Sequence, residues 1–236
     1  MIETTIETTL QTLDTTPIWL SIKLASLTTV ILLLITIPFS YWLYQKGRRV
    51  KSFFTALASL PLVLPPSVLG FYLLMLMGSN GPIGMLSTQL DIQLLAFSFP
   101  GLVIASVIYS FPFALQPIQN AFESMGKKPL EAAATLRASP VDRFFTIALP
   151  LAKPGILTAA VLSFAHTMGE FGVILMIGGN IPGETKVLSV AIYDHVEALE
   201  YDQAYILSGG MLLFSFVVLF TLYYLNNPSL SQEKTR

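Results

Sequence analysis

Long stretches of this chain carry no charged side chain. Asp, Glu, Lys and Arg are absent from residues 24–45, 52–90, 92–122 and 203–232. Each stretch is long enough for the roughly 20 apolar residues that cross the hydrocarbon core of a bilayer as a helix. A fifth apolar stretch, residues 154–178, is interrupted only by His166 and Glu170. The pattern predicts an all-α polytopic membrane protein with five transmembrane helices, or six if the chain crosses once more.

The composition supports a surface that faces lipid. Only 11% of the residues are charged, against roughly 25% in soluble proteins. The chain is 53% hydrophobic and has a mean hydropathy of +0.68, which argues against a soluble enzyme. It has no cysteine, which excludes disulfides and thiolate metal sites. A formal net charge of −1 gives no overall attraction to nucleic acid.

The positions of the cations predict the orientation, because short cytoplasmic loops collect Lys and Arg. Eleven of the thirteen lie in residues 46–51, 127–153 and 234–236. We therefore expect a multi-pass protein of the cell (inner) membrane with its N-terminus outside and its C-terminus in the cytoplasm. The expected parts are an external polar tail (1–17), a transmembrane domain (18–226) with a cytoplasmic loop at 120–150, and a cytoplasmic tail (227–236).

Residues 126–156 predict two short cytoplasmic helices. Pro129 suits a first helical position, and Glu131 lies in the first turn, where the helix dipole favours an anion. Residues 139–142 carry the Ser-Pro-x-Asp pattern of a capping box, and this second helix is expected to end at Pro150. Exposed apolar residues in such a loop are unfavourable unless the loop docks on a partner. The alternative is a loop folded on its own membrane domain.

This loop resembles the EAA signature of ABC-importer membrane subunits, E-A-A-x(3)-G-x(9)-I-x-L-P. The matching positions are Glu131, Ala132, Ala133, Ile147, Leu149 and Pro150. The resemblance implies a coupling helix that sits in a groove of a cytoplasmic ATPase. Arg137 occupies the glycine position, where a left-handed conformation costs other residues of order 1 kcal/mol. Arg137 either accepts this strain or shifts the turn to Ala138.

A second run, residues 166–193, is similar to molybdate-type importers, in which GEFG, GGNIPG-x-T and AIY recur in this order. Sulfate and thiosulfate permeases share much of the run, but the short chain favours molybdate. The resemblance implies a type I ABC-importer permease that forms a translocation path for molybdate, with tungstate possible, as a homodimer. The alternatives are a sulfate or thiosulfate permease and a membrane channel or assembly protein that uses no ATP.

The GEFG segment places ionisable groups inside a predicted span. His166 and Glu170 are four residues apart, so on a continuous helix they share a face and can form a hydrogen bond. A group of this kind is a candidate for a role in the pore. Packing is favoured, because an ionised Glu170 would repel a dianion. Gly169 and Gly172 permit a bend or a close helix approach.

Two further elements are candidates for the path. Gly179, Asn180, Pro182 and Gly183 form a turn cluster that is either an outer gate touching the delivery protein or an ordinary loop. Three prolines at positions 61, 65 and 66 predict a kink or an unwound turn. His195 is expected to be a solvated helix residue, and no metal site is expected.

The chain has no glycine-rich nucleotide-binding motif, so any ATP must bind to another chain. The expected partners are a cytoplasmic ABC ATPase dimer, an extracytoplasmic oxyanion-binding protein, a second copy of the chain and membrane lipid, but no nucleic acid. We expect no catalytic residue and no cofactor in this chain. The spans, as drawn from the sequence, lack Lys and Arg, so substrate choice should reside mainly in the binding protein.

Overall fold

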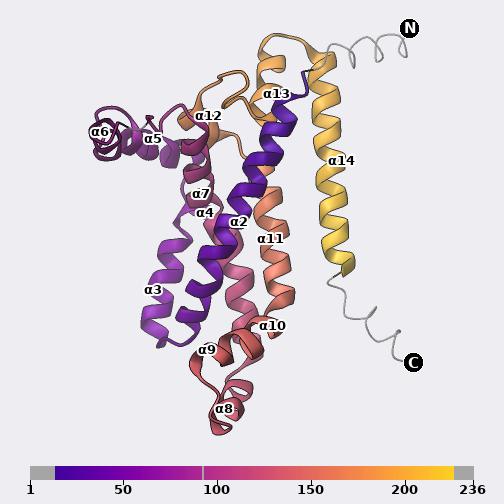
Figure 1. Ribbon diagram of the computed structural model, residues 1–236. Coiled ribbons are helices and arrows are strands. Elements are labelled where there is room, and N and C mark those ends of the chain that lie inside the picture. The colour runs from indigo at the N-terminus through magenta and orange to yellow at the C-terminus, as the bar shows by residue number, and fades with distance from the viewer. Residues whose placement is uncertain (1–13, 92, 226–236) are drawn as a thin grey trace.

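The computed structural model describes residues 14–91 and 93–225, and regular structure within these ranges is helical throughout (Figure 1). In chain order the elements are α2 (Thr16–Tyr44), α3 (Arg48–Ala58), α4 (Leu60–Val63), α5 (Pro66–Met77), α6 (Pro82–Gln89), α7 (Phe99–Met125), α8 (Lys128–Thr135), α9 (Pro140–Arg143), the π-helix η1 (Phe144–Ala148), α10 (Leu149–Leu151), α11 (Lys153–Met168), α12 (Gly172–Gly178), α13 (Leu188–Glu197) and α14 (Tyr201–Leu225). The predicted C-terminal tail and most of the N-terminal tail lie outside the described residues.

Three long helices, α2, α7 and α11, pack along one another and form the centre of the molecule (Figure 1). Their apolar side chains build a core in which Leu102, Ile118 and Phe122 are fully buried. The α7–α11 crossing is so close that a β-carbon at Gly155 would lie 2.4 Å from the Ala121 β-carbon. Glycine is therefore required at this crossing.

The second apolar stretch is not one straight span. The chain becomes extended at Leu64 and Pro65, because proline lacks a helical donor and disfavours the helical conformation in the residue before it. The predicted break at the prolines is confirmed. Beyond it, α5 and α6 project sideways from one end of the bundle (Figure 1). The predicted span at residues 154–178 is interrupted as well, because α11 ends at Met168 and α12 begins only at Gly172.

Four helical segments of the described chain are long and apolar enough to cross a membrane: Thr16–Tyr44, Pro66–Gln89, Phe99–Met125 and Tyr201–Tyr224. A fifth is added if Pro140–Leu151 and Lys153–Met168, which meet at 67°, count as one bent span. The all-α polytopic prediction is confirmed. The count is four or five, depending on whether the bent pair is one span, and helix breaks divide two of the predicted segments.

The last helix, α14, is the least enclosed of the long helices. Only 11% of its apolar window is buried, against 56% for α7, and it stands beside the bundle in Figure 1. Its contacts run through α13 and α11. Most of its surface is thus left for lipid or for another protein chain.

Candidate functional site

The loop with the EAA signature folds at the end of the bundle opposite α13 (Figure 1). Glu131 and Ala132 are exposed on α8, whereas the Ala133 side chain is 7% exposed and packs against its own chain. Leu136, at the turn after α8, is 83% exposed. Leu136, which the signature does not include, is thus the most exposed of the loop's large apolar residues.

Arg137 accepts the strain that a glycine would avoid. Its φ is +60°, in the left-handed region. The Ala138 N–H donates to the Ala133 carbonyl at 3.1 Å, and the Arg137 N–H donates to the Ala134 carbonyl at 3.0 Å. These two bonds define a Schellman motif. The turn therefore stays at the position where the family has glycine.

The second helix of the loop begins with the predicted capping box and ends one residue beyond the predicted position. The Ser139 hydroxyl accepts from the Asp142 N–H at 3.1 Å, and the Ser139 N–H donates to the Asp142 carboxylate at 3.3 Å, completing the capping box. The helical segment runs from Pro140 through η1 and α10 to Leu151, one residue beyond the expected end at Pro150, and Pro150 lies in the first turn of α10. A proline there needs no N–H donor. Ile147 lies in the π-helix η1 and Leu149 opens α10.

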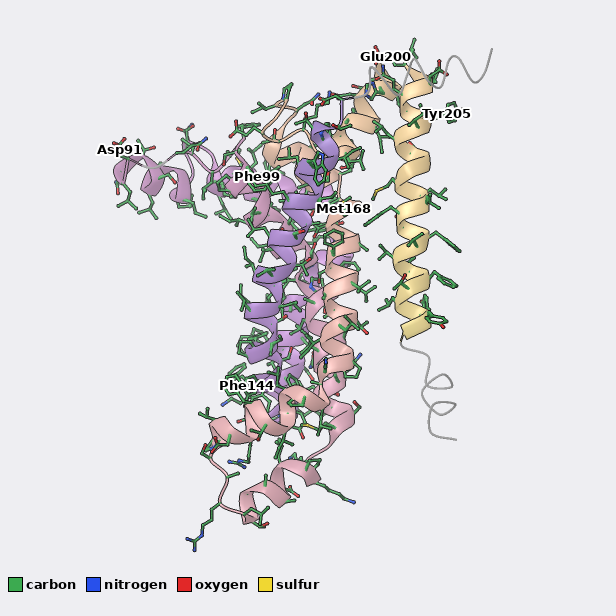
Figure 2. The ribbon with its side chains drawn as sticks, turned by 45° about the vertical axis from the view of Figure 1, so that its right-hand side comes forward. Asp91, Phe99, Phe144, Met168, Glu200 and Tyr205 are labelled. Atoms are coloured by element: carbon green, nitrogen blue, oxygen red, sulfur yellow. The ribbon has the colours of Figure 1, made fainter. Side chains whose placement is uncertain are left out.

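One side of this loop packs against the end of the helix bundle. The Phe144 ring lies 4.8 Å from the Tyr41 ring, which in turn lies 5.5 Å from the Phe122 ring. Figure 2 shows Phe144 at the end of the bundle opposite Glu200. On the other side Phe145 is exposed. Residues 144 and 145 thus join an aromatic anchor on α2 and α7 to an apolar surface outside the bundle.

The break between α11 and α12 separates the two predicted ionisable partners. The His166 Nδ1 lies 2.9 Å from the Ser110 hydroxyl, which lies 3.1 Å from the Thr167 hydroxyl. The His166 ring stacks on Phe113 with ring centroids 3.8 Å apart. The hydrogen bond that His166 and Glu170 could form on a continuous helix is absent, because α11 ends at Met168 and the helical four-residue spacing is not continued.

Glu170 lies in the break with its side chain only 4% exposed. Neither carboxyl oxygen has a hydrogen-bond partner among the described residues, and the Ser106 hydroxyl is the buried polar group beside it. A cavity of about 530 Å³ adjoins the carboxyl and is lined by Pro66, Tyr109, His166 and Gly169, among others. The cavity gives space for water or for a moving side chain.

The predicted turn cluster folds back on α13, at the end of the bundle opposite α8. Gly179 and Gly183 have φ values of +64° and +78°, which glycine adopts without strain. Pro182 is exposed. The Asn180 amide donates to the Asp194 carboxylate at 2.7 Å, and the Lys186 ammonium lies 2.6 Å from the same oxygen.

These contacts determine the direction in which the pKa of Asp194 shifts. Partial burial alone would raise the pKa of Asp194, but the hydrogen bonds from Lys186 and Asn180 outweigh it and hold that pKa below its ordinary value. Nearby, the His195 Nδ1 lies 2.8 Å from the Glu200 carboxylate. The described residues contain no cluster of metal-ligating side chains. The turn cluster is therefore an ordered loop, tied to α13 by the Asn180–Asp194 hydrogen bond.

Sequence reasoning missed a polar surface on the opposite half of α7. Gln116 and Asn120 are exposed there, although they belong to an uncharged transmembrane helix. Two hollows of about 670 and 540 Å³ flank this part of α7, and both residues line both hollows. The four-residue spacing of two amides inside an apolar stretch was the available signal.

Comparison with known proteins agrees with this arrangement. The model of a family described as "Binding-protein-dependent transport system inner membrane component" matches residues 36–232. The molybdenum transport system permease protein ModB of Azotobacter vinelandii is 60% identical over 210 residues, covering 89% of this chain and 93% of that protein. The protein of the same name from Escherichia coli K12 is 39% identical over 187 residues, covering 78% and 82%.

The fold has a counterpart among solved structures. A chain of the bacterial alginate ABC transporter, crystallised with an alginate pentasaccharide-bound periplasmic protein, aligns with a TM-score of 0.71 and 15% identity. The alignment covers 90% of this chain and 77% of that one. At this identity it shows the fold alone, which is that of an ABC-importer permease. The chain therefore belongs to the family of binding-protein-dependent transport system inner membrane components.

Proposed function

We propose that this chain is the membrane-spanning permease subunit of an ATP-driven importer for molybdate, with tungstate as a further substrate. The observation that carries the proposal is the cytoplasmic loop, whose aromatic anchor at Phe144 and exposed residue Leu136 suit it to pass movement from a partner to α2 and α7. The choice of molybdate rests on the 60% identity to a molybdenum permease.

The loop residues then have distinct roles. Glu131, Ala132 and Leu136 contact the ATPase, because they are exposed. Ala133 and Arg137 shape the turn that presents them, and Ile147, Leu149 and Pro150 continue the helix toward α11. At the other end, Gly179, Asn180, Pro182 and Gly183 form the outer gate and meet the binding protein. His166, Gly169, Glu170 and Gly172 pack the break between the two ends.

The assembly has three kinds of protein. A second copy of this chain completes the path, because one bundle of four or five spans is too thin a wall for a pore, and a two-fold dimer offers two loops to two ATPase subunits. The ATPase dimer binds ATP in the cytoplasm, and an extracytoplasmic protein delivers the oxyanion. Lipid covers the open surface of α14. This chain supplies no catalytic residue and no cofactor.

The orientation follows the positive charges. The end that carries α8 faces the cytoplasm, and the end that carries α13 faces outward, with the N-terminus outside and the C-terminus inside. On the cysteine-free chain, single cysteines at Lys127 and Glu184 should react with an impermeant reagent from opposite sides. Labelling of both from the same side would overturn this orientation.

The test of function is reconstitution with the ATPase and the binding protein in lipid vesicles. Molybdate-loaded binding protein should stimulate ATP hydrolysis and uptake more than protein loaded with sulfate or thiosulfate. Stronger stimulation by sulfate or thiosulfate would replace the substrate with that anion. Oxyanion flux without any ATPase subunit would replace the importer with a channel.

A further inference from the structure

A polar stripe runs along the half of α7 nearer the cytoplasmic loop. Gln116, Asn120 and Ser124 follow one another at four-residue spacing, and all three are exposed. Residues at this spacing share one face of a helix. Amide side chains are unfavourable in contact with lipid, so polar residues within a span face a protein interior or a water-filled cavity. The stripe therefore does not belong to the lipid surface.

The two hollows beside this stripe share Gln116 and Asn120 in their lining, and together we call them the inner groove. The hollow of about 670 Å³ lies between α7 and the start of α11 and includes Ser124 and Thr158. The hollow of about 540 Å³ lies between α3 and α7 and includes Thr55 and Ser59. Gln116 and Asn120 line both hollows. Amides and hydroxyls thus meet along the groove from two sides.

Some of these groups orient one another, while others are free to bind a ligand. The Gln119 amide donates to the Thr55 hydroxyl at 3.1 Å, so both are used within the protein. The Gln116 amide reaches the Ser59 hydroxyl at 3.5 Å, the outer limit of a hydrogen bond. Among the described residues, the Asn120 side chain forms no hydrogen bond. Asn120 and Gln116 are the donors that remain available.

The cation at the groove is neutralised. Lys51, on α3, forms an ion pair with Glu123, on α7, and both line the groove. An anion in the groove therefore meets neutral donors first. Neutral hydrogen bonds are roughly half as strong as those from charged groups, and a transport path must release what it binds.

We propose that the inner groove is a transient binding station for the tetrahedral oxyanion dianion between the membrane centre and the cytoplasm. Gln116 and Asn120 donate amide hydrogens to the oxyanion oxygens, and the Ser59 hydroxyl, which only accepts a hydrogen bond within the protein, adds a further donor. The absence of an unpaired cation from the groove lining keeps the dianion weakly held. This inference rests on the proposed function and names the part of the chain that contacts the substrate after the outer end has closed.

The first test uses the permease–ATPase complex without binding protein. Asn120→Cys should react with a negatively charged methanethiosulfonate reagent added from the cytoplasmic side, and free molybdate should slow this reaction several-fold. Lys127→Cys, which is exposed outside the groove, is the control and should react at the same rate with and without molybdate. No reaction at position 120, or equal rates with and without molybdate, would overturn the proposal.

The second test measures transport. Gln116→Leu combined with Asn120→Leu should lower molybdate uptake per ATP hydrolysed several-fold, and Asn120→Gln should restore part of it. An unchanged ratio in the assembled double variant would overturn the proposal. If the double variant does not assemble, the labelling test still decides. If the unaltered complex fails to take up molybdate, the proposed function fails; if it transports but position 120 is unprotected, only the binding station fails.

Discussion

Gly172 lies directly against Pro66: a β-carbon at position 172 would be 2.8 Å from the Pro66 β-carbon. Each residue opens the helix that follows a break, α12 and α5 respectively. The two helices also meet at Gly70, where a β-carbon would lie 2.7 Å from the Met176 β-carbon. The two interrupted segments are therefore held together as one packed pair.

Gly172→Ala should separate this pair. Adding a methyl group to a packed site typically costs about 1 to 3 kcal/mol, so the variant should unfold at a lower temperature and transport more slowly. Gly209→Ala is a matched control, because no atom lies within 4 Å of the β-carbon it would add. Thermal unfolding of both purified variants checks the prediction. Equal loss in the two variants would mean that the contact with Pro66 is not the cause.

Glu170→Gln should leave assembly intact. The glutamine has nearly the same shape and replaces a carboxyl group that forms no hydrogen bond with a described residue, so we expect a normal complex with modestly reduced uptake. Glu170→Leu should reduce the yield of the assembled complex, because it removes the polar group that lies next to both Ser106 and the cavity. Size-exclusion chromatography and uptake assays distinguish the two variants. Complete loss of uptake in an assembled Glu170→Gln complex would assign Glu170 to the transport step instead of packing.

Leu136→Asp should weaken binding of the ATPase without unfolding the permease. The side chain is 83% exposed, so the change affects a partner more than the chain's own core. Ala133→Asp is the contrasting variant, because it buries a carboxylate and should destabilise the loop itself. Co-purification of the ATPase measures the first effect, and thermal unfolding of the permease alone measures the second. Normal ATPase binding by Leu136→Asp would remove this residue from the contact surface.

Arg137→Gly should stabilise the loop. The left-handed conformation at this position costs a non-glycine residue about 1 to 2 kcal/mol, and the φ of +60° is one that glycine adopts freely. We expect a gain of about 1 kcal/mol or less, because glycine also loses more backbone entropy on folding. Thr135→Gly, in the last turn of α8, is the control and should destabilise by up to about 1 kcal/mol. A lower unfolding temperature for Arg137→Gly would show that the arginine side chain makes a compensating contact.

Local chemistry made parts of this structure predictable. The capping box at Ser139 and the break before Pro66 follow from the identity of a few neighbouring residues, and both are present. Properties that depend on distant contacts were not predictable in this way. Ala133 is buried by its own chain, and His166 pairs with Ser110 on another helix, because tertiary packing selects among partners that are equally possible in the sequence.

The long uncharged stretches predicted where the chain can cross a membrane, but they did not distinguish a straight span from a broken one. Residues 52–90 form four helices, since hydropathy averages over a window while one proline acts on its own turn. The polar stripe was overlooked for the same reason. Two amides at Gln116 and Asn120 scarcely change the mean hydropathy of α7, and their importance emerges from the hollows beside them.

The ion pair between Lys51 and Glu123 has an electrical consequence. Moving one elementary charge across a membrane potential of 100 mV involves about 2.3 kcal/mol. A dianion imported into a cell with a negative interior therefore requires about 4 to 5 kcal/mol of work per 100 mV. Lys51 and Glu123 are fixed to helices α3 and α7, so no positive charge of the groove crosses the membrane with the anion. The whole of it falls on the nucleotide cycle of the partner ATPase, so the rate of import should decline as the membrane potential grows.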